Sequence, residues 1–272
     1  MNKPILPLIV EPKELTHLLG TDQTLLVDLS NPQTYVQQHL PGAVYLEYNW
    51  IVHSEKPRNG LLPNVAQLGR VLGSLGLTPD THVVTYDDEG GGRASRFLWT
   101  LACVGHTKVS LLNGGLHAWT DKGRPLSQKI LYPTPGEYTA QLVNAPIADK
   151  QFILDHLNDD NVVVLDVRSP QEYSGAKVFA QKGGHIPGAV NMEWTEAMDQ
   201  DRQLRLKSAE QISALLDARG VSPEKTIVVY CQTHHRSAHT FVVLKSLGYE
   251  KVKGYPGSWS DWGNDSNTPV ET

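Results

Sequence analysis

The sequence predicts an α/β fold in two similar halves, each a parallel sheet flanked by helices. Two observations lead to this fold class. Short apolar runs of strand length alternate with helical patterns along the 272 residues. The second half of the chain also repeats, in the same order, the motifs of the first half. A chain of this length accommodates two modest domains.

The repeated motifs show where the two copies correspond and where they differ. The matching pairs are 25–28 with 163–166, 39–44 (His-Leu-Pro-Gly-Ala-Val) with 185–190 (His-Ile-Pro-Gly-Ala-Val), 82–86 with 227–230, and Trp119 with Trp262. The spacing between the copies is 138 residues at the first motif and 146 at the second. This difference places an insertion of eight residues in the second copy, within 174–184.

The expected elements follow the same order in both copies. In the first copy we expect a strand over 82–86 and a helix over about 93–104. In the second copy we expect buried strands over 161–167 and 226–230, and helices over 208–219 and 237–247. The strands read as continuous apolar runs, which is typical of parallel sheets. Apolar residues recur at helical spacing within 208–219, and Gly220 marks the end of that helix.

A stretch that contains several prolines joins the two copies. Four prolines lie between residues 121 and 148, and a segment of this composition does not form a continuous helix. We therefore expect a first domain at residues 1–125, a linker at 126–147 and a second domain at 148–272.

Composition limits the class of protein. The chain has 24 Lys and Arg against 29 Asp and Glu, a formal net charge of −5, which argues against a nucleic-acid partner. No apolar stretch approaches the ~20 residues needed to cross a bilayer, and the N-terminal residues do not resemble a signal peptide. Two cysteines, Cys103 and Cys231, are too few for a disulfide framework or an all-cysteine metal site. We expect a cytoplasmic protein that binds neither nucleic acid nor membrane.

The segment 231–237 (Cys-Gln-Thr-His-His-Arg-Ser) carries the chemistry. It follows a predicted strand and opens a predicted helix, and backbone N–H groups at such a turn converge on an anion. The helix N-terminus and the Arg236 cation stabilise a thiolate there, whereas a buried structural thiol would have apolar neighbours. We predict Cys231 as the nucleophile. The predicted substrate-binding residues are Gln232, Thr233, His234, His235, Arg236 and Ser237.

Four features of the chain together match a known family. They are the repeated His-Ile/Leu-Pro-Gly-Ala motif, the strand end Asp166–Ser169, the loop Cys231–Ser237 and the closing Trp259–Gly263. Over nearly its whole length the chain resembles the two-domain rhodaneses, or thiosulfate sulfurtransferases, and the loop looks most like that of the bacterial tandem type. The resemblance implies two rhodanese-like domains and one active site, in the second domain. It also implies that Cys231 takes the sulfane sulfur of thiosulfate as a persulfide and passes it to cyanide or a thiol. No metal or organic cofactor is implied.

The first copy is expected to be catalytically inactive. Aligned on the tyrosines that end the two strands, Asp87 occupies the position of Cys231. A carboxylate cannot form a persulfide, and the following acidic residues Asp88 and Glu89 would repel thiosulfate. We interpret this half as structural.

Four other functions use similar residues. A metal site built from Cys231, His234, His235 and His239 would occupy the nucleophile. A cysteine-dependent phosphatase also places Cys and Arg around such a loop, but its loop is one residue longer. A persulfide carrier that serves a partner protein would use the same Cys231. A 3-mercaptopyruvate sulfurtransferase tends to carry arginine at the position of Glu172, whose carboxylate would repel that keto acid if it faced the cleft.

The remaining polar and aromatic candidates are given structural roles. We expect Cys103 to lie in the core, Arg168 to form an ion pair with Asp166, and the His39 and His185 motifs to be structural turns. His234 and His235 are expected to line the mouth of the pocket. Trp194 is expected either to line the cleft or to pack in the core.

Overall fold

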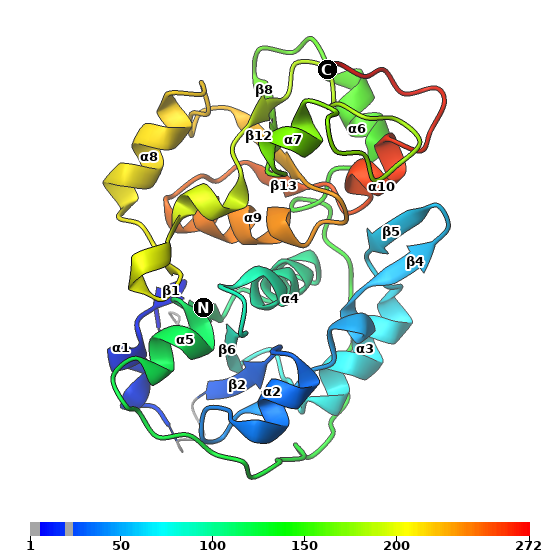
Figure 1. Cartoon of the computed structure of the whole chain (residues 1–272). Coiled ribbons are helices and arrows are strands. Elements are labelled where there is room, and N and C mark those ends of the chain that lie inside the picture. Colours follow the sequence, from blue (N-terminus) through cyan, green and yellow to red (C-terminus); the bar gives the residue numbers. More distant parts are fainter. Residues whose placement is uncertain (1–5, 20–23) are drawn as a thin grey trace. The chain divides into compact units, whose positions relative to one another are not determined.

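The computed structural model describes residues 6–19 and 24–272 (Figure 1). Residues 1–5, which carry part of the prediction about a signal peptide, lie outside the described residues, as do residues 20–23. By contacts the chain forms two compact units. The first unit comprises Met1–Ile51, Pro63–Val143 and Met198–Leu206; the second comprises Val52–Leu62, Asn144–Ala197 and Lys207–Thr272. Each unit thus contains a short segment from the other copy of the sequence. The domain boundaries predicted from the sequence, which follow chain order, do not take these two segments into account.

The first unit contains a parallel sheet flanked by helices. Its strand order is β1-β7-β6-β2-β3, and every neighbouring pair is parallel. The strands are β1 (Ile9–Val10), β2 (Thr24–Asp28), β3 (Val44–Tyr45), β6 (His82–Tyr86) and β7 (Val109–Leu112). The helices are α1 (Pro12–Thr16), α2 (Pro32–Gln37), η1 (Tyr48–Ile51), α3 (Val65–Ser74), α4 (Gly92–Cys103) and α5 (Gly115–Thr120). A small hairpin, β10 (Met198–Asp199) and β11 (Arg205–Leu206), encloses η3 (Gln200–Arg202).

The second unit repeats this plan. Its sheet has the order β13-β12-β8-β9 and is also parallel throughout. The strands are β8 (Val162–Asp166), β9 (Val190–Asn191), β12 (Thr226–Tyr230) and β13 (Val252–Gly254), with an antiparallel hairpin of β4 (His53–Glu55) and β5 (Arg58–Leu61). The helices are α6 (Lys150–Asp155), α7 (Pro170–Tyr173), η2 (Trp194–Ala197), α8 (Ala209–Asp217), α9 (Arg236–Ser246) and α10 (Ser258–Trp262). The predicted fold class is confirmed.

The predicted elements correspond closely to the observed ones. Strands β6 and β12 have the predicted bounds, and the three predicted helices are α4, α8 and α9. Helix α8 begins after Ser208 because the Ser208 hydroxyl accepts a hydrogen bond from the N–H of Gln211, and the side-chain oxygen of Gln211 accepts one from the N–H of Ser208. Helix α4 packs against β6 and β7, and α9 packs against β12 and β13 (Figure 1).

The repeated His-x-Pro-Gly-Ala motif is held by the same contacts in both units. The hydroxyl of Tyr86 accepts a hydrogen bond from the N–H of Leu40 at 3.0 Å. In the second unit the hydroxyl of Tyr230 accepts one from the N–H of Ile186 at 3.2 Å. Each turn is therefore fixed to the last residue of its central strand, β6 or β12.

The histidines of the two motifs also have equivalent neighbours. His39 stacks on Tyr35 with ring centroids 4.1 Å apart, and its Nδ1 lies 2.7 Å from the Tyr35 carbonyl oxygen. His185 stacks on Tyr173 at 3.6 Å, and its Nδ1 lies 2.9 Å from the Tyr173 carbonyl oxygen. The structural role that the sequence predicts for both histidines agrees with these contacts.

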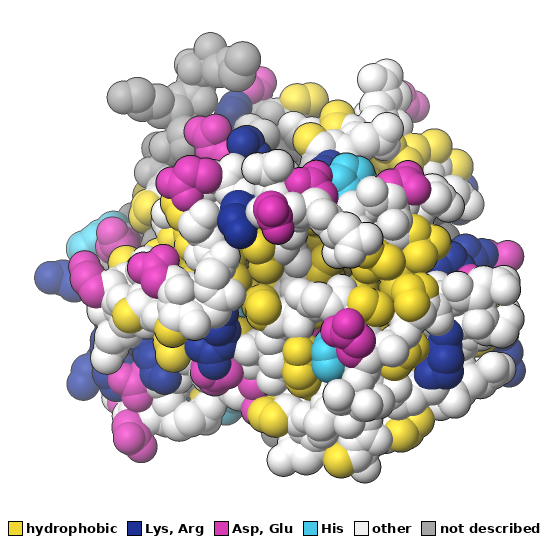
Figure 2. Space-filling model, turned by 90° about the horizontal axis from the view of Figure 1, so that it is seen from above, with side chains coloured by type: hydrophobic (Ala, Val, Ile, Leu, Met, Phe, Trp, Pro, Cys, Tyr) yellow, Lys and Arg dark blue, Asp and Glu magenta, His cyan; other side chains and the backbone are white. Residues whose placement is uncertain are grey.

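The helices and the surface bear on the expected absence of membrane and nucleic-acid partners. Among residues 6–19 and 24–272, no helix is both long enough and apolar enough to span a bilayer. On the face seen in Figure 2, Lys and Arg side chains are interspersed with Asp and Glu side chains, and hydrophobic side chains are exposed between them. The absence of a nucleic-acid partner stays a prediction from the net charge.

We predict that replacing Tyr230 with Phe lowers the free energy of unfolding by about 1–3 kcal/mol, because the buried N–H of Ile186 would lose its acceptor. Urea denaturation measures this difference. Tyr132→Phe is the matched control, since Tyr132 is 87% exposed. Equal free energies of unfolding for the two variants would contradict the role of the Tyr230 hydroxyl.

Candidate active site

Cys231 lies at the carboxyl end of the central strand of the second unit. It directly follows β12, which is flanked by β8 and β13, and α9 begins five residues later at Arg236. The side chain of His235, the residue before α9, makes no capping hydrogen bond to the helix. The loop 231–235, hereafter the catalytic loop, thus connects a strand end to a helix N-terminus, as the sequence predicts.

A serine that sequence reasoning did not single out anchors both ends of the catalytic loop. The hydroxyl oxygen of Ser258 accepts hydrogen bonds from the N–H groups of Cys231 at 3.3 Å and His234 at 3.1 Å. The same hydroxyl donates to the carbonyl of Tyr255 at 2.8 Å. The only sequence signal for Ser258 was its place next to the Trp259–Gly263 motif.

Helix α10 also binds the carbonyl groups of the catalytic loop. The N–H of Trp259 donates to the carbonyl of Cys231 at 2.9 Å, and the N–H of Ser260 donates to the carbonyl of Gln232 at 3.0 Å. These two carbonyl oxygens, which would repel a thiolate, are thereby satisfied by α10. This arrangement favours a negative charge on the cysteine.

The anchoring holds two residues in a strained backbone conformation. His234 has φ +54° and Ser258 has φ +50°, values that side chains with a Cβ rarely adopt. Both residues are fully buried, so packing and the shared hydrogen bond maintain this conformation. The prediction that His234 lines the mouth of the pocket is wrong, because the sharp turn directs its side chain into the protein.

The buried His234 side chain is linked to Cys231 through Ser237. Its Nδ1 lies 2.7 Å from the Ser237 hydroxyl oxygen, and that hydroxyl donates to the Cys231 sulfur at 3.4 Å. Because the serine proton points to sulfur, Nδ1 of His234 carries a proton and donates to the serine oxygen. The pair therefore orients a hydroxyl toward the thiolate.

The environment of Cys231 makes its thiol acidic. Burial opposes ionisation, but the charge of Arg236 and hydrogen bonds from the hydroxyl and N–H of Ser237 outweigh it and lower the pKa of the thiol to about 7. The N–H of Thr233 also donates to this sulfur. By contrast, burial raises the pKa of Cys103, which is fully buried on α4 as predicted. The chain thus has one thiol suited to nucleophilic attack at neutral pH.

Arg236 is held by a carboxylate. Its Nη1 and Nη2 donate to the two carboxylate oxygens of Glu172 at 2.7 and 2.8 Å. Burial opposes ionisation of Glu172, yet the hydrogen bonds and charge of Arg236 keep its pKa at about 2. Glu172 also closes a capping box with Ser169 at the start of α7. The ion pair therefore fixes the position of the guanidinium group, whose positive charge acts on both Glu172 and Cys231.

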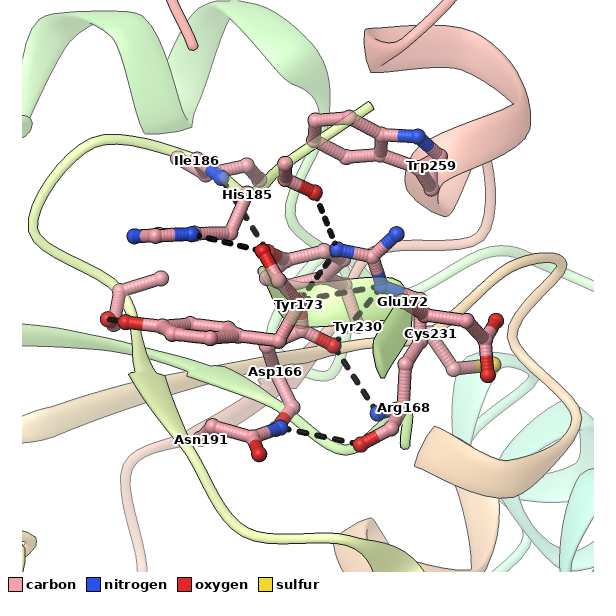
Figure 3. A network of polar contacts seen from close by, with 12 residues as sticks. Asp166, Arg168, Glu172, Tyr173, His185, Ile186, Asn191, Tyr230, Cys231 and Trp259 are labelled. Carbon is pink, nitrogen blue, oxygen red and sulfur yellow. Dashed lines mark hydrogen bonds and ion pairs between the residues drawn. The ribbon is translucent and has the colours of Figure 1, made fainter. Parts of the chain in front are cut away.

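A second buried arginine supports the site without facing it. Arg168 forms the predicted ion pair with Asp166, with 2.5 Å between Nη2 and Oδ2, and donates to the carbonyl of Gly184 at 2.7 Å (Figure 3). Its guanidinium group lies 4.4 Å from the centre of the Trp259 ring. Arg168 thereby connects β8 to α10, the helix that anchors the catalytic loop.

The other predicted candidates lie near the start of α9. The half-buried Trp194 lies 6.0 Å from the His235 ring and 5.4 Å edge-on from the buried His239 ring. Among the described parts of the chain, no group of three or more His, Cys, Asp and Glu side chains is arranged to hold a metal ion.

In the first unit, the side chain of Asp87 occupies the loop that is equivalent to the catalytic loop. The carboxylate of Asp87 accepts hydrogen bonds from the N–H groups of Glu89 at 3.0 Å, Gly91 at 2.7 Å and Ala94 at 2.9 Å. Burial raises the pKa of this carboxyl group. An anion of the protein thus fills the place where a bound anion would sit, which agrees with a structural role.

Comparison with known proteins identifies the family. The model of the rhodanese-like domain matches residues 11–122 and 149–265. The chain belongs to the rhodanese family. A thiosulfate sulfurtransferase of Azotobacter vinelandii is 46% identical over 266 residues, which are 98% of this chain and 97% of that protein. The resemblance found in the sequence is confirmed.

Two further relatives extend the comparison. The sulfur carrier protein TtuD of Thermus thermophilus is 35% identical over 249 residues, 87% of this chain and 86% of that protein. The solved structure of an anaerobic ergothioneine biosynthesis enzyme from Chlorobium limicola, with trimethyl histidine, has a TM-score of 0.88 and 22% identity. That match covers all of this chain and 72% of the other, and it shows the shared fold.

We predict that the rate of alkylation of Cys231 by iodoacetamide rises with pH through a midpoint of about 7. A Cys103→Ala background leaves one reactive thiol. Ser237→Ala should raise the midpoint by about one unit, since it removes a hydrogen bond to the thiolate. Ser246→Ala, on the last turn of α9, is the control. A wild-type midpoint near the ordinary cysteine value of about 8.5 would rule out an activated thiolate.

Proposed function

We propose that this chain is a thiosulfate sulfurtransferase that carries a sulfane sulfur as a persulfide on Cys231. The observation that carries the proposal is the thiol of Cys231, held at a pKa of about 7 at the N-terminus of α9. The relative from Azotobacter vinelandii, a thiosulfate sulfurtransferase, supports it. Thiosulfate, and cyanide or a cellular thiol, are then the substrates.

In the first half-reaction the Cys231 thiolate attacks the outer sulfur of thiosulfate. A sulfur–sulfur bond forms to the cysteine as the bond within thiosulfate breaks, and sulfite leaves with the electron pair. The enzyme retains a persulfide whose terminal sulfur bears the negative charge. The N–H groups of Thr233 and Ser237 donate to the Cys231 sulfur, one bond away from the terminal sulfur, and we expect them to stabilise the charge of the product as well.

In the second half-reaction an acceptor nucleophile attacks the terminal sulfur. Cyanide leaves as thiocyanate, or a thiolate leaves as a persulfide, and Cys231 returns to the thiolate form with the electron pair of the broken bond. Both half-reactions are displacements at sulfur in which the leaving group takes the electron pair, so neither requires a metal or a redox cofactor.

The bound Arg236 suits a compact inorganic donor. Glu172 accepts one N–H from each of the two outer nitrogens of Arg236, so the end of the guanidinium group that presents both nitrogens side by side is not available to the carboxylate of an organic donor. The sequence left the direction of Glu172 undecided. Its ion pair with Arg236 supports thiosulfate over 3-mercaptopyruvate.

A persulfide carrier is the second candidate. The relative TtuD is a sulfur carrier protein, and a carrier would load Cys231 by the same first step. The difference lies in the acceptor, which would be a sulfur-accepting protein. A phosphatase is less well supported, since only four residues separate Cys231 from Arg236. Free thiols are typical of a reducing compartment, which supports the predicted cytoplasmic location.

We predict that Cys231→Ala lowers sulfur transfer from thiosulfate to cyanide by at least about 10³-fold, since no other thiol can take its place. Thiocyanate formation is the measurement. Cys103→Ala is the control and should keep nearly full activity, because its thiol is buried and weakly acidic. Substantial turnover by Cys231→Ala would refute the proposed function.

We also predict that kcat/KM for thiosulfate exceeds that for 3-mercaptopyruvate by about tenfold or more, with cyanide as the common acceptor. Glu172→Gln should shift this ratio toward 3-mercaptopyruvate, because it frees the charge of Arg236 while glutamine still completes the capping box. A wild-type preference for 3-mercaptopyruvate would exclude the donor assignment and leave the persulfide step intact.

A further inference from the structure

The β4–β5 hairpin belongs to the catalytic unit although the first copy of the sequence encodes it. Residues Val52–Leu62 lie in the second unit, and β5 packs against α10. The strands are antiparallel, and Glu55 pairs with Arg58 across the turn. The predicted second domain, which starts at residue 148, does not include this hairpin.

The hairpin contacts the catalytic loop directly at Gly60. This buried glycine has φ +77°, and its Cα faces the backbone of Thr233. A Cβ at this position would overlap the Thr233 carbonyl oxygen, and it would lie 2.7 Å from the carbonyl carbon and 2.9 Å from the Thr233 Cβ. Only glycine permits this approach, because the obstructing atoms are mainly backbone.

A second link joins the hairpin to the loop through α10. The N–H of Asn59 donates to the Ser260 hydroxyl oxygen at 2.9 Å, and the carbonyl oxygen of Asn59 lies 3.0 Å from the same hydroxyl. The N–H of Ser260 in turn donates to the carbonyl of Gln232. Gly60 therefore contacts Thr233 directly, and Asn59 is linked to Gln232 through Ser260.

The first unit has the corresponding arrangement around its own loop. There the β10–β11 hairpin, from the second copy, places Leu204 against the loop that follows Asp87. A Cβ on Gly90 would lie 3.3 Å from the Leu204 Cβ and 2.9 Å from the Met198 sulfur. In both units, therefore, a hairpin contacts the loop that follows the central strand. In the second unit the glycine at this contact, Gly60, belongs to the hairpin, whereas in the first unit the glycine, Gly90, belongs to the loop.

We propose that the β4–β5 hairpin is a positioning element of the active site, in which Gly60 holds Thr233 so that its N–H points at the Cys231 sulfur. This inference rests on the proposed role of Cys231. Gly60 acts through Thr233 and is therefore a positioning residue. The first copy, whose Asp87 cannot carry sulfur, thereby supplies a part that the second copy lacks.

The test replaces Gly60 with Ala in the full-length chain. The methyl group should displace Thr233, raise the midpoint of Cys231 alkylation by about half a unit or more, and lower kcat/KM for thiosulfate by about 10- to 100-fold. Gly188→Ala is the matched control. Gly188 lies in the same unit with φ +71°, and the nearest atom to a Cβ there is the Leu157 carbonyl oxygen at 4.0 Å. It carries the same backbone strain without a contact, so the control should keep both values.

A second variant covers the case in which Gly60→Ala fails to fold. Ser260→Ala removes the hydrogen bonds to Asn59 and should shift both measurements in the same direction, by less. If Gly60→Ala folds and keeps the wild-type alkylation midpoint and the wild-type kcat/KM, the proposal is overturned. If only Ser260→Ala folds, wild-type values in that variant overturn it. Equal losses in Gly188→Ala would do so too. The alkylation midpoint needs no turnover, so this result is separate from the activity of Cys231→Ala, which tests the proposed function.

Discussion

The site depends on keeping a negative sulfur inside the protein. Burial of Cys231, which is 1% exposed, opposes its ionisation, and the surrounding groups must more than compensate for that cost. Arg236 supplies charge, while Ser237 and Thr233 supply hydrogen bonds. Each of these groups is itself fixed by another residue, such as Glu172 on Arg236 and His234 on Ser237. The same donors suit a persulfide, whose charge lies one bond further from the backbone.

The two copies solve the same physical problem in different ways. In both units a strand end leads into a helix whose first N–H groups face an anion. In the second unit the anion is the proposed Cys231 thiolate. In the first it is the carboxylate of Asp87, which accepts two hydrogen bonds from its own loop and one from the first turn of α4. The two units thus share a fold, whereas their loops differ at every aligned position from Asp87 and Cys231 onward.

Much of the fold and part of the site are predictable from sequence because they depend on local patterns. Apolar runs define β6 and β12, Ser208 defines the start of α8, and the position of Cys231 between strand and helix indicates its chemistry. The partners of the loop are less accessible. Ser258 binds His234 and Cys231, which precede it by 24 and 27 residues in the sequence. Glu172 and Arg236, which form an ion pair, are 64 residues apart in the sequence. The buried turn of His234 and the exchange of hairpins depend on tertiary packing, for which no residue pattern gave a signal.

The most direct test of this account is the intact mass of the protein after incubation with thiosulfate and removal of excess donor. The persulfide mechanism predicts a mass increase of one sulfur atom, located on the peptide that contains Cys231 and lost when cyanide is added. Peptide mapping under non-reducing conditions locates the atom. An unchanged mass, or a sulfur atom carried elsewhere in the chain, would contradict the central role of the Cys231 thiolate.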